Sequence, residues 1–182
     1  MLQRKIMNQL IAWKSREQRK CLLLQGARQV GKTYIVEEFG KQYYEHVITL
    51  NFEKNSSYRD IFEGDYDVDR IVARIMLAVP GSRFVPGKTL LFLDEIQSCP
   101  NARTALKFLS IDGRYDVIAS GSLLGIGYGE VSSFPVGYIE RVTMYSLDFE
   151  EFLWALGIDS SVIEFVKGFY ESRTKVDESV HA

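Results

Sequence analysis

The sequence predicts an α/β fold in which helices cover both faces of a parallel β-sheet. Short apolar runs alternate with segments of helical periodicity, which is typical of successive strand–helix–strand units. The run at 90–93 is apolar without interruption, as expected of a strand buried on both faces. Residues 26–33 read GARQVGKT, a glycine-rich loop between an apolar run and a helix-competent stretch. Together these observations predict a P-loop NTPase fold.

The expected elements follow from the same pattern in chain order. A first helix places four apolar residues on one face: Leu2, Ile6, Leu10 and Trp13. The segments after it are a strand at 21–25, a helix ending near 39, a strand near 46–52, a polar segment to 69, a helix over 71–79, a strand at 90–93, a helix after 100, and strands at 115–119 and near 138–145.

Two short helices close the predicted fold. Asp148 with Glu151 three residues later predicts a capping box for the first helix, whose apolar face runs over 149–156. The second helix has its apolar positions over 162–169. We therefore expect four parts: an N-terminal helix packed on the core at 1–20, a P-loop NTPase core at 21–147, its C-terminal helices at 148–170, and a frayed polar tail at 171–182.

Composition excludes several classes of protein. A length of 182 residues suits one domain, and an apolar content of 46% argues against disorder. The net charge of -2 gives no reason to expect binding to nucleic acid or a membrane surface, and no segment approaches the ~20 apolar residues of a membrane span. Cys21 and Cys99 lack metal-ligand spacing, so both are expected to be reduced thiols in a cytoplasmic protein.

The loop at 26–33 has the residues that phosphate binding requires, the Walker A pattern. Its two glycines let successive backbone N–H groups face an anion, and the start of the following helix adds positive potential. Lys32 is expected to reach the β- and γ-phosphates, and the Thr33 hydroxyl to bind Mg²⁺. The nucleotide is expected to contact the loop and the first helical residues: Gly26, Ala27, Arg28, Gln29, Val30, Gly31, Lys32, Thr33 and Tyr34.

Two carboxylates follow the apolar run at 90–93, as in the Walker B pattern. The carboxyl ends of parallel strands lie on the ligand side of the sheet, so Asp94 is expected to hold Mg²⁺ opposite the phosphate loop. Glu95 is then expected to be the catalytic base for the attacking water, with Lys32 as the second catalytic residue.

Two serines end the next predicted strand. A hydroxyl of Ser120 or Ser122 is placed to contact the γ-phosphate and its attacking water. An equally good interpretation is that both serines cap a turn around Gly121.

These motifs resemble a known family. The segments RKCLLLQGARQVGKT, NFE, LLFLDEIQ, ASGS and YSLDFEEFLWALG are similar to those of bacterial and archaeal AAA+-like ATPases that carry a C-terminal domain of unknown function. The resemblance implies ATP as the nucleotide, the roles given above for the loop and the two carboxylates, and Ser120 or Ser122 at a polar sensor position. It also implies a helical lid and a C-terminal domain beyond residue 182.

The chain departs from the family pattern at one place. Members commonly have Gly-Arg before the final strand, where this chain has Gly137 and Tyr138. Arg141 and Arg28 are therefore only candidate arginine fingers, and a surface salt bridge is the other interpretation of each.

The predicted function is an Mg²⁺-dependent ATPase core, weak without its lid; the alternative is a nucleotide-gated switch with little hydrolysis. A small-molecule kinase is disfavoured by the Asp94–Glu95 pair, and a GTPase by the lack of an N-K-x-D motif. The expected partners are the nucleotide, the C-terminal domain or another protein, and a possible homo-oligomer. Neither a membrane nor a nucleic acid is expected.

Overall fold

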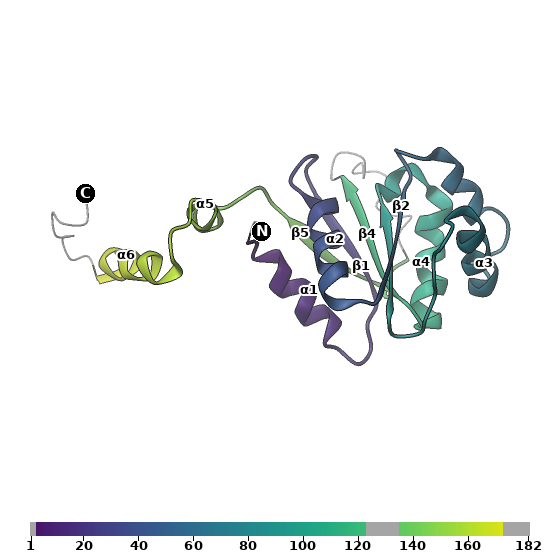
Figure 1. Ribbon diagram of the computed structural model, residues 1–182, viewed down its shortest axis with the longest axis horizontal. Helices are drawn as coiled ribbons and strands as arrows, with labels where there is room; N and C mark the ends of the chain where they lie inside the picture. Colours follow the sequence, from purple (N-terminus) through teal and green to yellow (C-terminus); the bar gives the residue numbers. More distant parts are fainter. Residues whose placement is uncertain (1–2, 123–134, 173–182) are drawn as a thin grey trace. The chain divides into compact units, whose positions relative to one another are not determined.

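The described residues, 3–122 and 135–172, contain a five-stranded parallel sheet in this computed structural model (Figure 1). Its strands are β1 (Cys21–Gly26), β2 (His46–Asn51), β3 (Thr89–Asp94), β4 (Asp116–Ser122) and β5 (Ile139–Met144). The spatial order is β2-β3-β4-β1-β5, and each neighbouring pair is parallel. The predicted α/β class with a parallel sheet is therefore confirmed.

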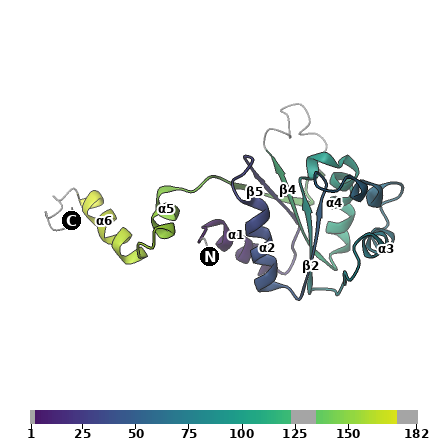
Figure 2. The ribbon, with the colours of Figure 1, turned by 45° about the horizontal axis from the view of Figure 1, so that its top comes forward.

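Helices cover both faces of this sheet (Figures 1 and 2). One face carries α1 (Ile6–Lys14) and α2 (Lys32–Tyr43), and the other carries α3 (Val68–Ala78) and α4 (Pro100–Asp112). Two short 3₁₀ helices, η1 (Ser56–Phe62) and η2 (Ile96–Ser98), follow β2 and β3. The segment to 69, expected to be polar throughout, thus includes η1, whose Ile61 and Phe62 are buried.

The order of the strands explains their sequences. Every residue of β3 and β4 is buried because both strands lie inside the sheet and under helices. Side chains of β1 alternate between the two faces: Cys21 and Leu23 belong to the core cluster that includes α3 and α4, whereas Leu22 and Leu24 lie outside that cluster and are equally buried. The predicted apolar face of the first helix is confirmed for Ile6, Leu10 and Trp13; Leu2 lies outside the described residues.

The chain divides into two compact units, residues 7–146 and residues 1–6 with 147–182. In the second unit, α5 (Phe149–Ala155) begins with the predicted capping box of Asp148 and Glu151, and α6 (Ser160–Ser172) follows. Lys5 Nζ donates to Asp148 Oδ2 over 2.7 Å. Residues 173–182 of the predicted tail lie outside the described residues.

The apolar positions of these last two helices do not build a core within the described residues. Phe149 is 76% exposed and Leu156 is 63% exposed, whereas Ile163 is 6% exposed. The apolar face predicted over 149–156 is therefore largely exposed in the described structure.

Candidate active site

The glycine-rich loop joins the carboxyl end of β1 to the amino end of α2. Its backbone adopts left-handed conformations at Gln29 (φ 64°) and Gly31 (φ 94°). Gly26 lies against β5, since a Cβ on it would stand 2.3 Å from the backbone oxygen of Met144. The first loop glycine is therefore required by close packing, and the second by its conformation.

Lys32 and Thr33 begin α2 and face two different parts of the site. Lys32 is 4% exposed, and its ammonium donates to the carbonyl oxygens of Gly26 (3.2 Å) and Ala27 (2.7 Å). An ammonium has three N–H donors, so these bonds leave one for a ligand. The Thr33 hydroxyl donates to Asp94 Oδ2 over 2.9 Å, and its oxygen lone pairs remain for a cation.

Asp94 is the polar centre of the site. It ends β3 and is 0% exposed. Besides Thr33, its carboxylate accepts hydrogen bonds from Asn51 Nδ2 (2.6 Å) and from the Ser120 hydroxyl. Asn51 ends β2, directly beside Asp94 in the sheet, and was not among the predicted site residues. The only feature that could have pointed to Asn51 as a site residue is its position at the end of the strand that neighbours β3.

Glu95 leaves the strand in an unusual conformation. Its φ of 56° and ψ of 50° are left-handed, which is uncommon for a residue with a side chain. Its backbone N–H donates to the Ser120 hydroxyl (3.2 Å), and its Oε2 accepts from Gln97 Nε2 (2.6 Å). The predicted base therefore lies beside the predicted metal ligand Asp94.

The two predicted serines have different surroundings. Ser120 lies between Asp94 and the Glu95 backbone, so it orders the two acidic residues. Ser122 is 1% exposed and pairs with Gly26 in the sheet, and its hydroxyl has no hydrogen-bond partner in the described structure. Of the two, only Ser122 has a hydroxyl that is available beside the start of the loop.

The remaining predicted residues lie at the rim or away from the site. Tyr34 is 46% exposed. Arg28 pairs with Glu53 over 3.5 Å, both side chains being largely exposed. Arg141 is exposed and lies in the middle of β5, opposite Leu23. The arginine-finger role of either residue stays a prediction.

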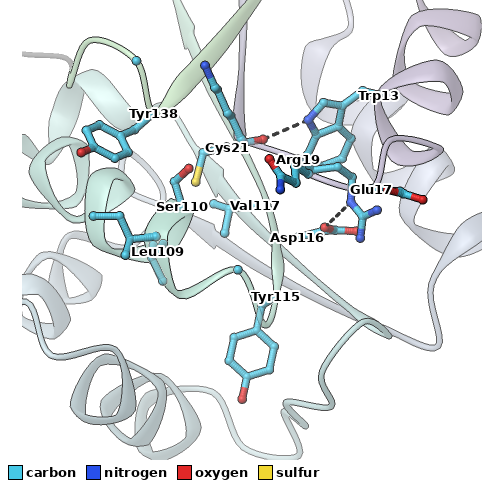
Figure 3. A pocket seen from close by; sticks show the side chains of 15 residues that line it. Trp13, Glu17, Arg19, Cys21, Leu109, Ser110, Tyr115, Asp116, Val117 and Tyr138 are labelled. Atoms are coloured by element: carbon cyan, nitrogen blue, oxygen red, sulfur yellow. Dashed lines mark hydrogen bonds and ion pairs between the residues drawn. The ribbon is translucent and has the colours of Figure 1, made fainter.

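Two of the cavities in the described structure lie at opposite ends of the strands. One, of about 230 Å³, is lined by Thr33, Asn51 and Asp94 of the candidate site and by five residues around them: Glu37, Thr49, Lys54, Asn55 and Tyr58. A larger one, of about 490 Å³, lies at the amino ends of β1 and β4 (Figure 3). There Arg19 Nε pairs with Asp116 Oδ1 (2.8 Å), and Trp13 Nε1 donates to the Lys20 carbonyl (3.0 Å), so these polar groups serve the fold.

An Mg²⁺ ion bound with a nucleotide usually takes one or two carboxylates plus phosphate oxygens and water. Asp94 supplies one carboxylate, and the Thr33 hydroxyl oxygen lies in contact with it. In residues 3–122 and 135–172 no group of three or more His, Cys, Asp or Glu side chains forms a metal site. Likewise, none of the helices in the described ranges is long and apolar enough to cross a membrane.

The fold and the site define a P-loop NTPase. The chain belongs to a family described as an AAA domain, whose model matches residues 18–153. This membership indicates a nucleotide-binding, ATPase-like domain. The chain is also similar to a protein of Haemophilus influenzae described as uncharacterized, with 26% identity over 161 residues that cover 85% of this chain. The match spans 38% of the length of that relative.

Proposed function

We propose that this chain binds ATP with Mg²⁺ and hydrolyses it to ADP and phosphate. The observation that carries the proposal is the hydrogen bond between Thr33 and Asp94, residues that are 61 positions apart in the sequence. It joins the start of the helix after the phosphate loop to the acidic end of β3. The two halves of a P-loop site are thereby brought together.

The loop would bind the phosphates, and its residues suit that role. The amino end of α2 and the turned backbone from Gly26 to Gly31 supply N–H groups and positive potential. Lys32 adds a buried cation with a donor to spare. Asp94 and Thr33 would hold Mg²⁺, which when bound neutralises charge on the β- and γ-phosphates.

In this proposal Glu95 is the side chain that activates water. In the proposed step a water oxygen attacks the γ-phosphorus, the bond from that phosphorus to the bridging oxygen of ADP breaks, and Glu95 accepts the proton that the water loses. The backbone N–H of Glu95 donates to the Ser120 hydroxyl, which fixes the backbone from which the Glu95 side chain starts. General-base catalysis of this kind contributes about 10²- to 10⁴-fold in rate.

The test compares phosphate release and ATP binding in the wild type, Glu95→Gln and a control, Glu63→Gln, at an exposed position. We expect Glu95→Gln to lower kcat by about 10²-fold or more with the Kd for ATP unchanged, and Glu63→Gln to match the wild type. Binding of ATP by the wild type without phosphate release would refute hydrolysis and favour the nucleotide-gated switch.

The proposal also covers the partner to which ATP turnover is coupled and the cellular location of the protein. Because the chain spans 38% of the matched relative, we propose that ATP turnover acts on a further domain or a partner protein, with assembly into a homo-oligomer as one route. A cytoplasmic location is supported by two buried cysteines that are both free thiols.

A further inference from the structure

The side-chain amide of Gln97 lies between two carboxylates at the edge of the candidate site. Its Nε2 donates to Glu95 Oε2 over 2.6 Å and to Glu53 Oε1 over 3.5 Å. The first bond is short and joins residues only two positions apart. An amide nitrogen has two N–H donors, so each of its protons faces one carboxylate.

This arrangement fixes which way the amide points. Turning the amide over would place Gln97 Oε1 against two acceptors, which repel it. In the observed orientation Oε1 is buried and has no hydrogen-bond partner among the described residues. A buried acceptor without a partner costs free energy. The orientation of the amide is therefore maintained by the hydrogen bonds from its nitrogen to Glu95 and Glu53, and not by any bond to its oxygen.

The backbone between Glu95 and Gln97 makes the contact possible. The left-handed conformation of Glu95 begins the 3₁₀ turn η2, and the Ser98 N–H closes it on the Glu95 carbonyl (3.0 Å). Ile96 is 0% exposed and anchors the turn in the core. A left-handed residue with a side chain is strained, and such strain is concentrated at functional sites. The turn folds the side chain of Gln97 back onto that of Glu95.

The backbone of Glu53, the residue that carries the second carboxylate, is hydrogen-bonded to the centre of the site. The backbone N–H of Glu53 donates to Asn51 Oδ1 (3.1 Å), and Asn51 Nδ2 donates to Asp94 (2.6 Å). Arg28 of the phosphate loop pairs with the Glu53 carboxylate (3.5 Å). Gln97 thus contacts a residue whose backbone is linked through Asn51 to the predicted metal ligand Asp94.

We propose that Gln97 is a positioning residue that orients the Glu95 carboxylate for water activation, an inference that rests on the proposed function. Gln97 engages Oε2 and leaves Oε1 of Glu95 to accept the proton of the attacking water. Without the amide, the Glu95 side chain rotates freely and adopts the productive geometry for a smaller fraction of the time. Because Gln97 is not in the phosphate loop, its loss lowers kcat and leaves ATP binding intact.

The experiment uses the 182-residue chain and two substitutions that keep the size of the side chain. Gln97→Met removes both donors, and Gln97→Glu replaces them by a third carboxylate. Gln9→Met, at an exposed position of α1, is the matched control. We expect both Gln97 variants to lower kcat by about 10- to 100-fold, as a misplaced catalytic group does, with KM and the Kd for ATP within twofold of the wild type.

A readout independent of turnover is the ¹⁵N–¹H signal of the Gln97 side-chain amide, assigned by its absence in Gln97→Met. We expect one proton to be shifted downfield and protected from exchange, and to lose both properties in Glu95→Ala. An amide signal indifferent to Glu95→Ala would overturn the inference, as would equal kcat values in the wild type and Gln97→Met. Those results leave the ATPase proposal standing, whereas a wild type that binds ATP without releasing phosphate refutes the ATPase proposal and the inference together.

Discussion

Replacing Gly26 by alanine tests the packing that places the phosphate loop. Gly26 is the last residue of β1 and pairs with Ser122 of β4 on one side and Met144 of β5 on the other. A methyl group there would lie 2.3 Å from the Met144 carbonyl oxygen and 3.3 Å from the Val30 side chain. The first contact is with backbone, which has no rotamer that relieves it.

The size of the effect follows from that contact. Cβ atoms essentially never approach closer than 3.0 Å, so β1 and β5 would have to separate by at least 0.7 Å (3.0 minus 2.3). Overpacking typically costs about 1–3 kcal/mol, and we expect the upper end because two paired strands must move. For a protein of this size, about 3 kcal/mol corresponds to a fall in Tm of roughly 6–12 °C. The same movement displaces the loop and weakens ATP binding.

The assay is urea denaturation together with calorimetric titration of Mg-ATP. Gly168→Ala in α6 is the matched control, because a Cβ there has no heavy atom within 4 Å, and a helical alanine is expected to leave stability equal or raise it by about 0.5–1 kcal/mol. If Gly26→Ala keeps both the urea midpoint and the affinity of the wild type, the close approach of β5 to the loop is refuted.

Three further predictions concern metal binding, pH and thiol chemistry. Mg²⁺ should tighten ATP binding to the wild type, and Asp94→Ala should remove this Mg²⁺ dependence in titrations with and without EDTA; persistence of the dependence would place the metal elsewhere. The pKa of Asp148 is lowered by the N–H of Glu151 and by Lys5, so its stabilisation of α5 is full above the unfolded pKa of about 3.9 and is lost as pH falls through the lower folded value. Hydrogen exchange of the α5 amides should follow this loss, and Asp148→Asn should flatten it. Burial raises the pKa of Cys21 to about 12, so this thiol should react with Ellman's reagent at pH 8 only when urea unfolds the protein; rapid reaction of the native protein would contradict its burial.

The fold was predictable because its strongest signals are local. The uninterrupted apolar run of β3 and the glycine loop before α2 identify a buried parallel strand and a turn into a helix without knowledge of distant contacts. The capping box at Asp148 is local in the same way. The 3₁₀ helix η1 was missed, since its start depends on Asn55 accepting from the Ser57 N–H within a polar segment.

The site was predictable only in part because its contacts join distant strands. Asn51 contacts Asp94 across 43 residues, and only the order of β2 and β3 shows that they are neighbours. The different surroundings of Ser120 and Ser122 follow from strand register: Leu93 pairs with Ala119, so Ser120 lies beside Asp94 and Ser122 lies two residues further along β4. The exposure of Phe149 depends on the tertiary structure around α5, which helical periodicity does not specify.

Thermal unfolding of the wild type and of Lys32→Ala, each with and without Mg-ATP, tests nucleotide binding most directly. ATP at about 100 times its Kd should stabilise the wild type by about 2.7 kcal/mol, which raises Tm by roughly 5–10 °C for a domain of this size. Lys32→Ala should show no rise, because it removes the buried cation of the phosphate loop. An equal rise in both proteins would place the nucleotide outside the loop at 26–33 and contradict the account.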